Sequence, residues 1–482
     1  MRPLLRGGRG ALACGLPLAA SAGAAMLAGG GSAADAAVAA GAVLCVVLPD
    51  ACGLGGDALA LVRAPDGSEI AYNGSGAAPA ALPPGEIPAE GAGAAAVPGA
   101  VAALADLHAR HGTLPWSAVL APAERIAREG TALTESLLSA VARHRPRLER
   151  GAPGWALLRP GLAAGARVPQ PELAALLERI ADHGAPAFYE GALEGPLAPG
   201  DLHAHRTPIL APVVRDRLGA RISAQPPVSQ ALLVLIALGA LETDAPRLGA
   251  DRAHHLVEAL EGAFAHRDAI GGISLEDAAA LADTPVEVDP ARARRRGGPR
   301  GGAHTTAVAA ADSDGLVVSM LLSVFDVFGS AVLVTAGGFL LNDRLHGFTT
   351  GPNRPAPGRR PVHTLSPLLV AETGRTYALC TPGADGQVQT LSQILAAVLL
   401  DGTPLSAALA APRWRSVDGR LAVEAGYDPA VLEELARRGH EIVRAEPGVV
   451  DFGAAACAGI DFATGTTFAA TDPRREVWGA AV

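Results

Sequence analysis

Apolar residues recur every three or four positions in several segments before residue 270. Two of these segments also carry boundary signals: one has Pro98 near its start and Gly112 at its end, and another runs from Pro171 to Gly184. Proline suits the first turn of a helix and glycine suits its end, so the spacing and the boundaries together predict amphipathic helices that cover a core. The predicted helices are residues 97–112, 171–184, 229–242 and 253–268.

The pattern changes near residue 281 from helical spacing to short apolar runs. Residues 281–304 are rich in Pro, Gly and Arg, and we expect a mobile surface segment there. Residues 305–312 and 316–324 then flank a turn at 312–315, which predicts a β-hairpin. Helices followed by strands favour packed layers of sheet and helix. Further strands are predicted at 375–383 and 420–425, and a further helix at 391–400.

Composition indicates a globular protein with a small-molecule site. The chain has 482 residues, of which 49% are hydrophobic, so it can bury a large core. Its net charge is −9 and only 4% of its residues are aromatic, which argues against a nucleic-acid surface. The basic run at 291–300 contains glycines and a proline, and we interpret it as a solvated loop, because a phosphate-binding face needs a broader basic field. No nucleic-acid partner is expected.

The cysteines and the N-terminal residues indicate in which cellular compartment the protein is expected. The five cysteines are scattered and never spaced as Cys-x-x-Cys, so neither a disulfide framework nor a zinc knuckle is indicated, and a reducing compartment fits best. Residues 1–24 have basic residues before an apolar run and could form a signal peptide. The apolar stretch at 33–48 contains Asp35 and is too short to span a bilayer, so no membrane partner is expected. The cysteines are Cys14, Cys45, Cys52, Cys380 and Cys457.

The sequence contains no lysine. This absence excludes the phosphate-loop lysine, Schiff-base and pyridoxal chemistry, and the Ser-x-x-Lys nucleophile.

Thr305 begins the predicted hairpin directly after the flexible segment. A threonine hydroxyl needs a base beside it, and one arrangement uses the threonine's own α-amine, with a pKa of about 7.7 to 8. An internal Thr305 acquires that amine only if the bond after His304 is cut. The alternative is structural, because Thr is common at strand starts for its β-propensity.

Residues 305–348, "TTAVAAADSDGLVVSMLLSVFDVFGSAVLVTAGGFLLNDRLHGF", resemble the start of the small subunit of the γ-glutamyltransferase (γ-glutamyltranspeptidase, glutathione hydrolase) family of N-terminal-nucleophile hydrolases. The resemblance extends from about residue 9 to the C-terminus and follows the family order. Segments that carry it include "PLAASAGAAMLAGGGSAADAAVAAGAVLCVVLPDACGLGGDALALV", "NRPAPGRRPVHTLSP", "PGADGQVQTLSQIL", "APRW" and "DPRR". In this family the N-terminal apolar run is the first folded helix rather than a signal, which favours a cytoplasmic location.

The resemblance implies an α+β fold, a four-layer αββα sandwich built jointly by two subunits. Self-cleavage would give a large portion, residues 1–304, and a small portion, residues 305–482, paired as a heterodimer. Thr305 would be the nucleophile, and Ser323 would hydrogen-bond its amine. The backbone N–H groups of Gly383 and Ala384 would form the oxyanion hole. Attack on a γ-glutamyl or related, glutathione-like amide would give an acyl-enzyme that water or a second amine resolves, without a cofactor or metal.

This sequence departs from the family where γ-glutamyl enzymes hold the glutamyl group. Ser75 occupies the place of the arginine that binds the α-carboxylate, and His363 and Thr364 replace a serine pair. Gly347 and Phe325 replace the aspartate and asparagine that bind the α-amine. Because charge-assisted contacts of this kind contribute roughly 1.5 to 3 kcal/mol each, the reaction class is predicted more securely than the substrate. The residues that could bind an anionic acyl group differently are Arg344, His363 and Arg360, the last of which could equally belong to a surface loop.

Other chemistries compete with this interpretation. The motif "CGLGGD" could cradle a phosphate with Cys52 as a nucleophile, but it lacks the G-x-G-x-x-G spacing, so a tight turn near the site is favoured. His203 and His205 form a His-x-His pattern without a completing cluster, and adjacent His254 and His255 cannot face one ion together. Two alternatives to a γ-glutamyl enzyme stay open: an acylase with a non-glutamyl acyl group, and a non-catalytic, unprocessed homologue that acts as a binding protein.

Overall fold

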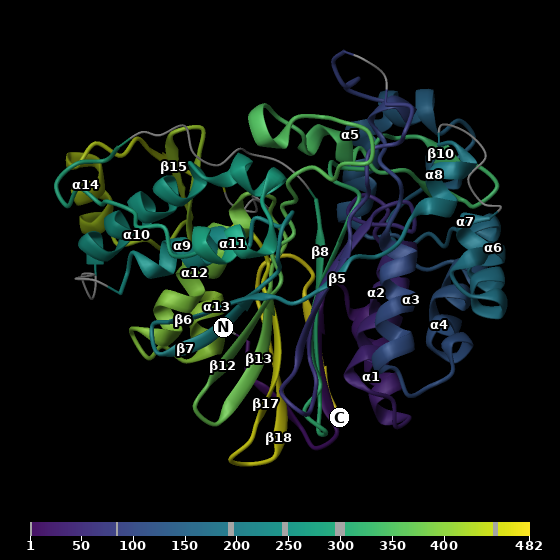
Figure 1. The fold of residues 1–482 in the computed structure, drawn as a ribbon. Helices are drawn as coiled ribbons and strands as arrows, with labels where there is room; N and C mark the ends of the chain where they lie inside the picture. The colour runs from purple at the N-terminus through teal and green to yellow at the C-terminus, as the bar shows by residue number, and fades with distance from the viewer. Residues whose placement is uncertain (1, 83–84, 191–196, 243–248, 295–303, 447–451) are drawn as a thin grey trace.

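The computed structural model describes residues 2–82, 85–190, 197–242, 249–294, 304–446 and 452–482. Two seven-stranded antiparallel sheets pack face to face, and helices cover the outer face of each (Figure 1). This is the predicted αββα sandwich, and it confirms the fold class. The first sheet has the order β19(Trp478–Ala481), β2(Gly10–Cys14), β8(Thr306–Asp312), β9(Val317–Ser323), β3(Asp57–Arg63), β4(Glu69–Gly74), β5(Ile209–Leu210). The second has the order β1(Leu5–Gly7), β18(Thr466–Thr471), β17(Ala456–Asp461), β13(Arg375–Cys380), β12(Leu368–Glu372), β7(Ala220–Ala224), β6(Val213–Arg217).

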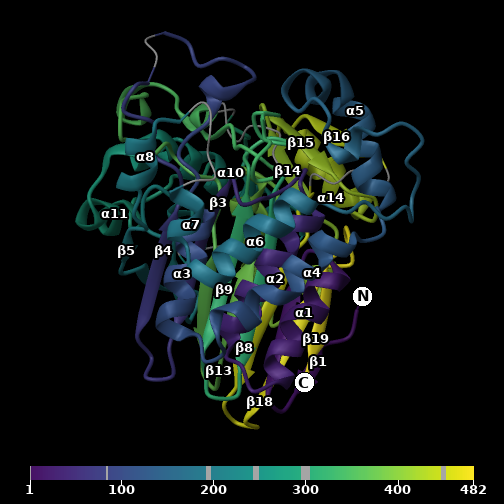
Figure 2. The same cartoon turned by 90° about the vertical axis from the view of Figure 1, so that its right-hand side faces the viewer.

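The two helical layers come from different parts of the chain. Figure 2 shows helices from the N-terminal part over the first sheet, and Figure 1 shows the second helical layer on the opposite side. The helices of the N-terminal part are α1(Pro17–Ala28), α2(Ala33–Val47), α3(Ala100–His111), α4(Trp116–Glu129), α5(Glu135–Gly151), α6(Pro171–His183), α7(Pro186–Tyr189) and α8(Pro199–Ala204). Of these, α1, α2 and α3 contact the strands of the first sheet directly. The second group is α9(Leu232–Gly239), α10(Gly249–Phe264), α11(Leu275–Leu281), α12(Gly386–Leu399), α13(Leu405–Ala410) and α14(Pro429–Arg437). Smaller sheets are β10(Leu333–Val334) with β11(Phe339–Leu340), and β14(Trp414–Val417), β15(Arg420–Val423) and β16(Ile442–Arg444).

The space between the two sheets is filled largely by small side chains. Strands that lie buried on both faces lose the alternation of apolar and polar residues, and β8 is buried at every position. Because alanine adds little bulk, the inner faces of the sheets can approach closely. The alanines of this layer include Ala11, Ala13, Ala307, Ala309, Ala456 and Ala458.

Helix α2 explains the apolar stretch that contains Asp35. Every residue of α2 is buried. Ser32 caps the helix by accepting the Asp35 N–H, and the Asp35 carboxylate accepts the Ser32 N–H at 2.8 Å and the Thr113 N–H at 2.9 Å. Among the described residues, no helix has both the length and the apolar character needed to cross a bilayer. Residues 17–24, the end of the stretch that could have formed a signal peptide, belong to α1, and α1 packs in the same core cluster as α2.

Most predicted elements are present with shifted ends. The helix at Pro171 ends at His183, as its glycine stop predicts, whereas α12 begins at Gly386, before the predicted residue 391. The hairpin β8–β9 is confirmed, and Gly315, with a φ of 98°, lies at its turn. Part of the segment predicted to be mobile, residues 295–303, lies outside the described residues. Its described portion is held to the body, because the Arg294 N–H donates to Glu258.

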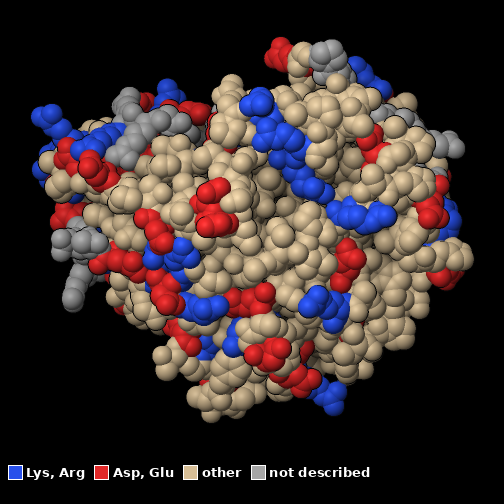
Figure 3. Space-filling model, in the orientation of Figure 1, with Lys and Arg blue, Asp and Glu red and all other residues tan. Residues whose placement is uncertain are grey.

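On the face seen in Figure 3, arginine and acidic side chains are interspersed over a largely uncharged surface. All five cysteines are buried free thiols, as expected from their spacing.

Candidate active site

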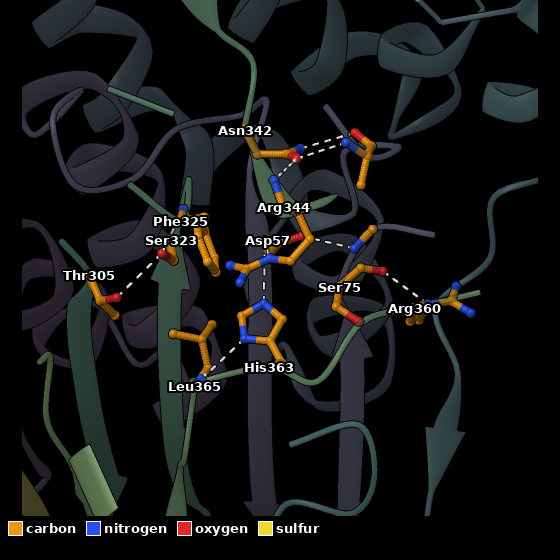
Figure 4. A network of polar contacts seen from close by, with 12 residues as sticks. Asp57, Ser75, Thr305, Ser323, Phe325, Asn342, Arg344, Arg360, His363 and Leu365 are labelled. Atoms are coloured by element: carbon orange, nitrogen blue, oxygen red, sulfur yellow. Dashed lines mark hydrogen bonds and ion pairs between the residues drawn. The ribbon is translucent and has the colours of Figure 1, made fainter. Parts of the chain in front are cut away.

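The register of the first sheet aligns the predicted nucleophile with two further polar residues. Thr306 pairs with Leu322, so Thr305 lies beside Ser323 at the end of β9. Ser323 pairs in turn with Asp57, the first residue of β3. The three side chains therefore come from adjacent strands at one end of the sheet, where Figure 4 shows them close together.

Thr305 and Ser323 form a hydrogen-bonded pair beside the carbonyl of His304. Thr305 is 3% exposed, and its Oγ1 donates to Ser323 Oγ at 3.3 Å. Ser323 Oγ donates to the His304 carbonyl oxygen at 3.1 Å and accepts the Phe325 N–H at 3.0 Å. In the continuous chain, the second hydroxyl thus polarises the carbonyl of the peptide bond that precedes Thr305.

Gly383 and Ala384 occupy the turn between β13 and α12. Their φ values are 130° and 51°, and the second is in the left-handed region that alanine rarely adopts. The turn is fixed, because Gly386 N–H donates to the Gly383 carbonyl at 2.9 Å and Gln230 donates to the Ala384 carbonyl at 3.2 Å. Both carbonyls are therefore engaged, whereas the two N–H groups have no hydrogen-bond acceptor within the described part of the chain, which is the arrangement that the predicted oxyanion hole requires.

Asp57 is the centre of a buried charged cluster. Its Oδ2 accepts from Arg344 Nε at 2.7 Å and lies 3.3 Å from His363 Nε2, and its Oδ1 accepts the Gly76 N–H at 2.8 Å. Burial raises the pKa of this carboxyl, but the positive charge of Arg344 and the nearby His363 imidazole outweigh it and lower the pKa to about 2. Asp57 is therefore an anion at neutral pH.

Arg344 presents the unsatisfied part of its guanidinium toward the reacting end of the site. Its side chain is 0% exposed, and only Nε meets Asp57. Nη1 and Nη2 have no hydrogen-bond partner among the described residues. The guanidinium lies 4.6 Å from the centroid of the Phe325 ring, and Figure 4 shows its outer nitrogens on the side of Phe325 and Ser323. A buried guanidinium with two unsatisfied nitrogens is suited to an anionic ligand with two oxygens.

The backbone around Arg344 is fixed by Asn342. The Asn342 side chain donates to the Gly55 carbonyl at 2.8 Å and to the Ala96 carbonyl at 3.1 Å, and its Oδ1 accepts the Arg344 N–H at 3.0 Å. Three separate segments are thereby tied together, so the position of the guanidinium is set by the fold rather than by a loop of its own.

His363 is a neutral imidazole whose tautomer is set by its contacts. The Leu365 N–H donates to Nδ1 at 3.1 Å, so the ring proton is on Nε2, which faces Asp57. Burial and the charge of Arg344 lower the pKa of His363 to about 4, against the opposing effect of Asp57.

This tautomer gives a testable pH dependence of stability. In the unfolded chain the imidazole takes up a proton as the pH falls through about 6.5, whereas in the folded chain it stays neutral until about 4. The contribution of His363 to stability is therefore present above about pH 6.5 and is lost as the pH falls toward 4. Between about pH 7 and 4.5, the wild-type protein should lose about 2 to 3 kcal/mol more unfolding free energy than His363→Gln, measured by denaturant unfolding. If both proteins lost the same unfolding free energy, the imidazole of His363 would take up its proton over the same pH range in the folded and unfolded chains.

Ser75 and Thr364, two other predicted substrate-binding residues, already form hydrogen bonds within the protein. Ser75 is buried, but its hydroxyl donates to Asn73 Oδ1 at 2.5 Å, while its carbonyl accepts from Arg360 Nε at 3.0 Å. Thr364 is 5% exposed, and its carbonyl accepts from Gln230 at 3.3 Å. A Cβ at Gly347 would lie 3.1 Å from Pro361 Cβ, so an aspartate at this position would require Pro361 to move.

Asp57 and Asn342 were not identified from the sequence. The available signal for Asp57 was a carboxylate that opens an otherwise apolar strand directly after "CGLGG". That motif is a close-packed turn, because a Cβ at Gly56 would lie 2.3 Å from the Ser323 carbonyl oxygen. Burial raises the pKa of Cys52 well above its ordinary value, which makes it an inert thiol.

Neither histidine of the His-x-His pattern belongs to a candidate metal-ligand cluster among the described residues. His203 Nδ1 lies 2.7 Å from the Pro199 carbonyl oxygen, whereas the His205 ring stacks on Tyr189. The two imidazoles are thus engaged with different partners and do not converge.

Comparison with known proteins gives one consistent assignment. The family model described as Gamma-glutamyltranspeptidase matches residues 19–482. The chain is 33% identical to an oxamate amidohydrolase proenzyme from Klebsiella pneumoniae, over 93% of this chain and 94% of that protein. It is 32% identical to the acylase ACY 1 proenzyme of Pseudomonas sp. (strain SE83), over 91% of this chain and 88% of that protein. The crystal structure of cephalosporin acylase from Bacillus halodurans superposes with a TM-score of 0.88 at 28% identity, covering 100% of this chain and 97% of that chain.

Proposed function

Because this chain belongs to the γ-glutamyltranspeptidase family of amide-cleaving enzymes, we propose that it cuts itself between His304 and Thr305 and then uses Thr305 as its nucleophile. The large portion would be residues 1–304 and the small portion residues 305–482, paired as a heterodimer. The family's relatives named as proenzymes support such a maturation step.

The contacts around His304 support the proposed self-cleavage step. Thr305 Oγ1 adds to the His304 carbonyl carbon while Ser323 Oγ, 3.1 Å from the carbonyl oxygen, donates to the developing oxyanion. The C–N bond then breaks, its nitrogen takes up the proton that the Thr305 hydroxyl released, and water hydrolyses the ester that remains. The product is a free α-amine on Thr305 beside its own hydroxyl.

The mature site would carry out acyl transfer in two steps. Thr305 Oγ1 attacks the substrate carbonyl, its α-amine accepts the hydroxyl proton, and the amides of Gly383 and Ala384 hold the oxyanion. The substrate amine leaves with a proton, and water or a second amine releases the acyl group. Each amide donor of this kind contributes roughly 3 to 4 kcal/mol to transition-state stabilisation.

We propose that the acyl group carries a carboxylate but no α-amine. The unsatisfied Nη1 and Nη2 of buried Arg344 carry this proposal, because they match the two oxygens of a carboxylate. The positions where γ-glutamyl enzymes bind the amine hold Phe325 and Gly347, which offer no carboxylate or amide side chain. A short dicarboxylic monoamide fits this set of groups, and the oxamate amidohydrolase relative is named for one such compound. Hydrolysis or transfer of γ-glutamyl, glutathione-like amides is the second candidate, favoured by the family model.

Three p-nitroanilides separate these substrates, because they differ by one group at a time. Glutaryl anilide is γ-glutamyl anilide without its α-amine, and butyryl anilide also lacks the carboxylate. We expect the highest kcat/KM for glutaryl, and a roughly 10- to 100-fold lower value for butyryl, as for one lost charged hydrogen-bond pair. Preference for γ-glutamyl would favour the second candidate, and equal rates for glutaryl and butyryl would exclude a carboxylate-binding role for Arg344.

Intact-mass measurement of freshly purified protein tests the maturation step. We expect two species, whose masses correspond to residues 1–304 and 305–482, to replace the full-length chain on incubation. N-terminal sequencing of the smaller species should begin Thr-Thr-Ala. A full-length chain that stays uncut while it hydrolyses the anilides would contradict the proposal.

A further inference from the structure

Two histidines and a glutamate converge at a place separate from the active site. His254 and Glu258 lie four residues apart on α10, and His440 follows α14. One ligand-type atom from each residue lies within 4.8 Å of the others. Residues i and i+4 share a face of a helix, so α10 presents an imidazole and a carboxylate together toward His440.

The imidazoles are oriented by contacts outside the cluster. His254 Nε2 lies 2.7 Å from the Asp289 carbonyl oxygen, so Nε2 carries the proton and donates. His254 Nδ1 therefore accepts a hydrogen bond from His440 Nε2, 2.8 Å away. Zinc would take the place of the proton between these two nitrogens, and the neutral His440 ring would then carry its proton on Nδ1. The backbone N–H of Arg294 donates to the Glu258 carboxylate at 3.0 Å. Histidine ligands in metal sites are commonly held in this way, with the second ring nitrogen on a carbonyl.

A cavity of about 20 Å³ adjoins the cluster, and Glu258 and His440 are among its lining residues. This volume exceeds the roughly 10 to 15 Å³ that one water molecule needs. The cavity can therefore hold a water molecule beside Glu258 and His440.

We propose that His254, Glu258 and His440 form a binding site for zinc, with a water molecule as the fourth ligand. Two imidazoles and a carboxylate are a ligand set that zinc accepts. At metal–nitrogen bonds of about 2.0 to 2.1 Å, two tetrahedral ligands lie about 3.4 Å apart, so binding parts the two rings by about half an ångström. His440 is only half-buried and follows Gly439, so its ring can make this movement.

The site would join the two portions of the chain. His254 and Glu258 precede the His304–Thr305 bond, and His440 follows it. Zinc binding does not depend on cleavage, but, if the proposed cleavage occurs, the ion becomes a link between the subunits. The ion then stabilises the assembled form, because the three ligands converge only there.

Zinc titration of untagged, chelator-stripped protein tests the site. The measurements are done in the Thr305→Ala background, so that the result is independent of cleavage and activity. We expect one zinc per chain by elemental analysis after gel filtration, and a melting temperature that rises with zinc. His440→Ala should lose at least tenfold in zinc affinity and most of the thermal shift, and Glu258→Gln should weaken binding as well.

His255→Ala is the matched control. His255 is the neighbour of His254 on α10, but its Nε2 contacts the Ala240 carbonyl at 2.9 Å. This variant should bind zinc as the parent does. Circular dichroism of each metal-free variant establishes that it is folded, and His440→Ala, at a half-buried position, is the variant least expected to perturb the core. Stoichiometric zinc in folded His440→Ala, or no zinc in the parent, would overturn the proposal.

Discussion

Thr305→Ala should remain a single uncut chain and should show no hydrolysis of the anilides above background. In the proposed mechanism the same hydroxyl attacks the His304 carbonyl and the substrate, so one substitution should remove both steps. A loss of at least about 10³-fold in kcat/KM is expected, as for removal of a nucleophile. Intact mass and anilide hydrolysis measure the two effects separately.

Thr305→Ser is the matched variant for this prediction. It keeps the oxygen and loses one methyl, so it should still cut itself and retain activity, although at reduced rates. Thr305 is almost fully buried, and the alanine variant could fail through a folding defect, so the melting temperatures of both variants must be compared with the parent. Turnover by the uncut alanine variant would remove Thr305 from the mechanism.

Arg344→Lys should abolish the preference for glutaryl over butyryl anilide. Lysine keeps the positive charge beside Asp57 but lacks the forked pair of Nη donors, so the carboxylate loses its bidentate partner. We expect kcat/KM for glutaryl anilide to fall about 10- to 100-fold, while the value for butyryl anilide changes little. The ratio of the two values is the measurement, because a general defect of folding or processing lowers both alike.

Removing the arginine charge alone would be a poor test. Arg344 and Asp57 are both 0% exposed, and truncation of one partner leaves the other as an unpaired buried ion, at a cost of about 3 to 5 kcal/mol. The double variant Asp57→Asn, Arg344→Gln removes both charges together and is the second protein to measure. If either folded variant keeps the glutaryl preference, Arg344 does not bind the acyl carboxylate.

Much of the fold could be predicted because its elements carry local signals. The helix at Pro171 and the hairpin around Gly315 carry clear turn or boundary residues, and both are present in the structure. Helix α12 begins before its predicted start because Gly386 and Gln387 lie directly after the turn at Gly383 and Ala384, whose geometry no propensity reveals. The family resemblance, rather than periodicity, supplied the sandwich and the pairing of the two portions.

The sequence supplied candidates for roles that a single residue defines, but not for roles that depend on residues from several parts of the chain. Thr305 and Ser323 were found through the family motif, and their 3.3 Å contact agrees with it. Asp57 was missed because its importance arises only when β3 is paired with β9 and Arg344 is brought to it from far along the chain. The contact between His254 and His440 likewise joins residues that no local pattern connects.

The strand order of the two sheets has a consequence for what a cut at residue 304 can release. Strands β8 and β9 are flanked by β2 and β3, and in the second sheet β12 adjoins β7 while β18 adjoins β1. Each sheet thus contains strands from residues 1–304 next to strands from residues 305–482, and neighbouring strands are hydrogen-bonded along their length. Separation of the fragments would expose those edges and the alanine layer together, which amounts to unfolding. Cleavage at this bond would therefore free the Thr305 amine while the fold stays assembled. Fragments 1–304 and 305–482 produced separately would have to fold together, because neither could form its sheets alone.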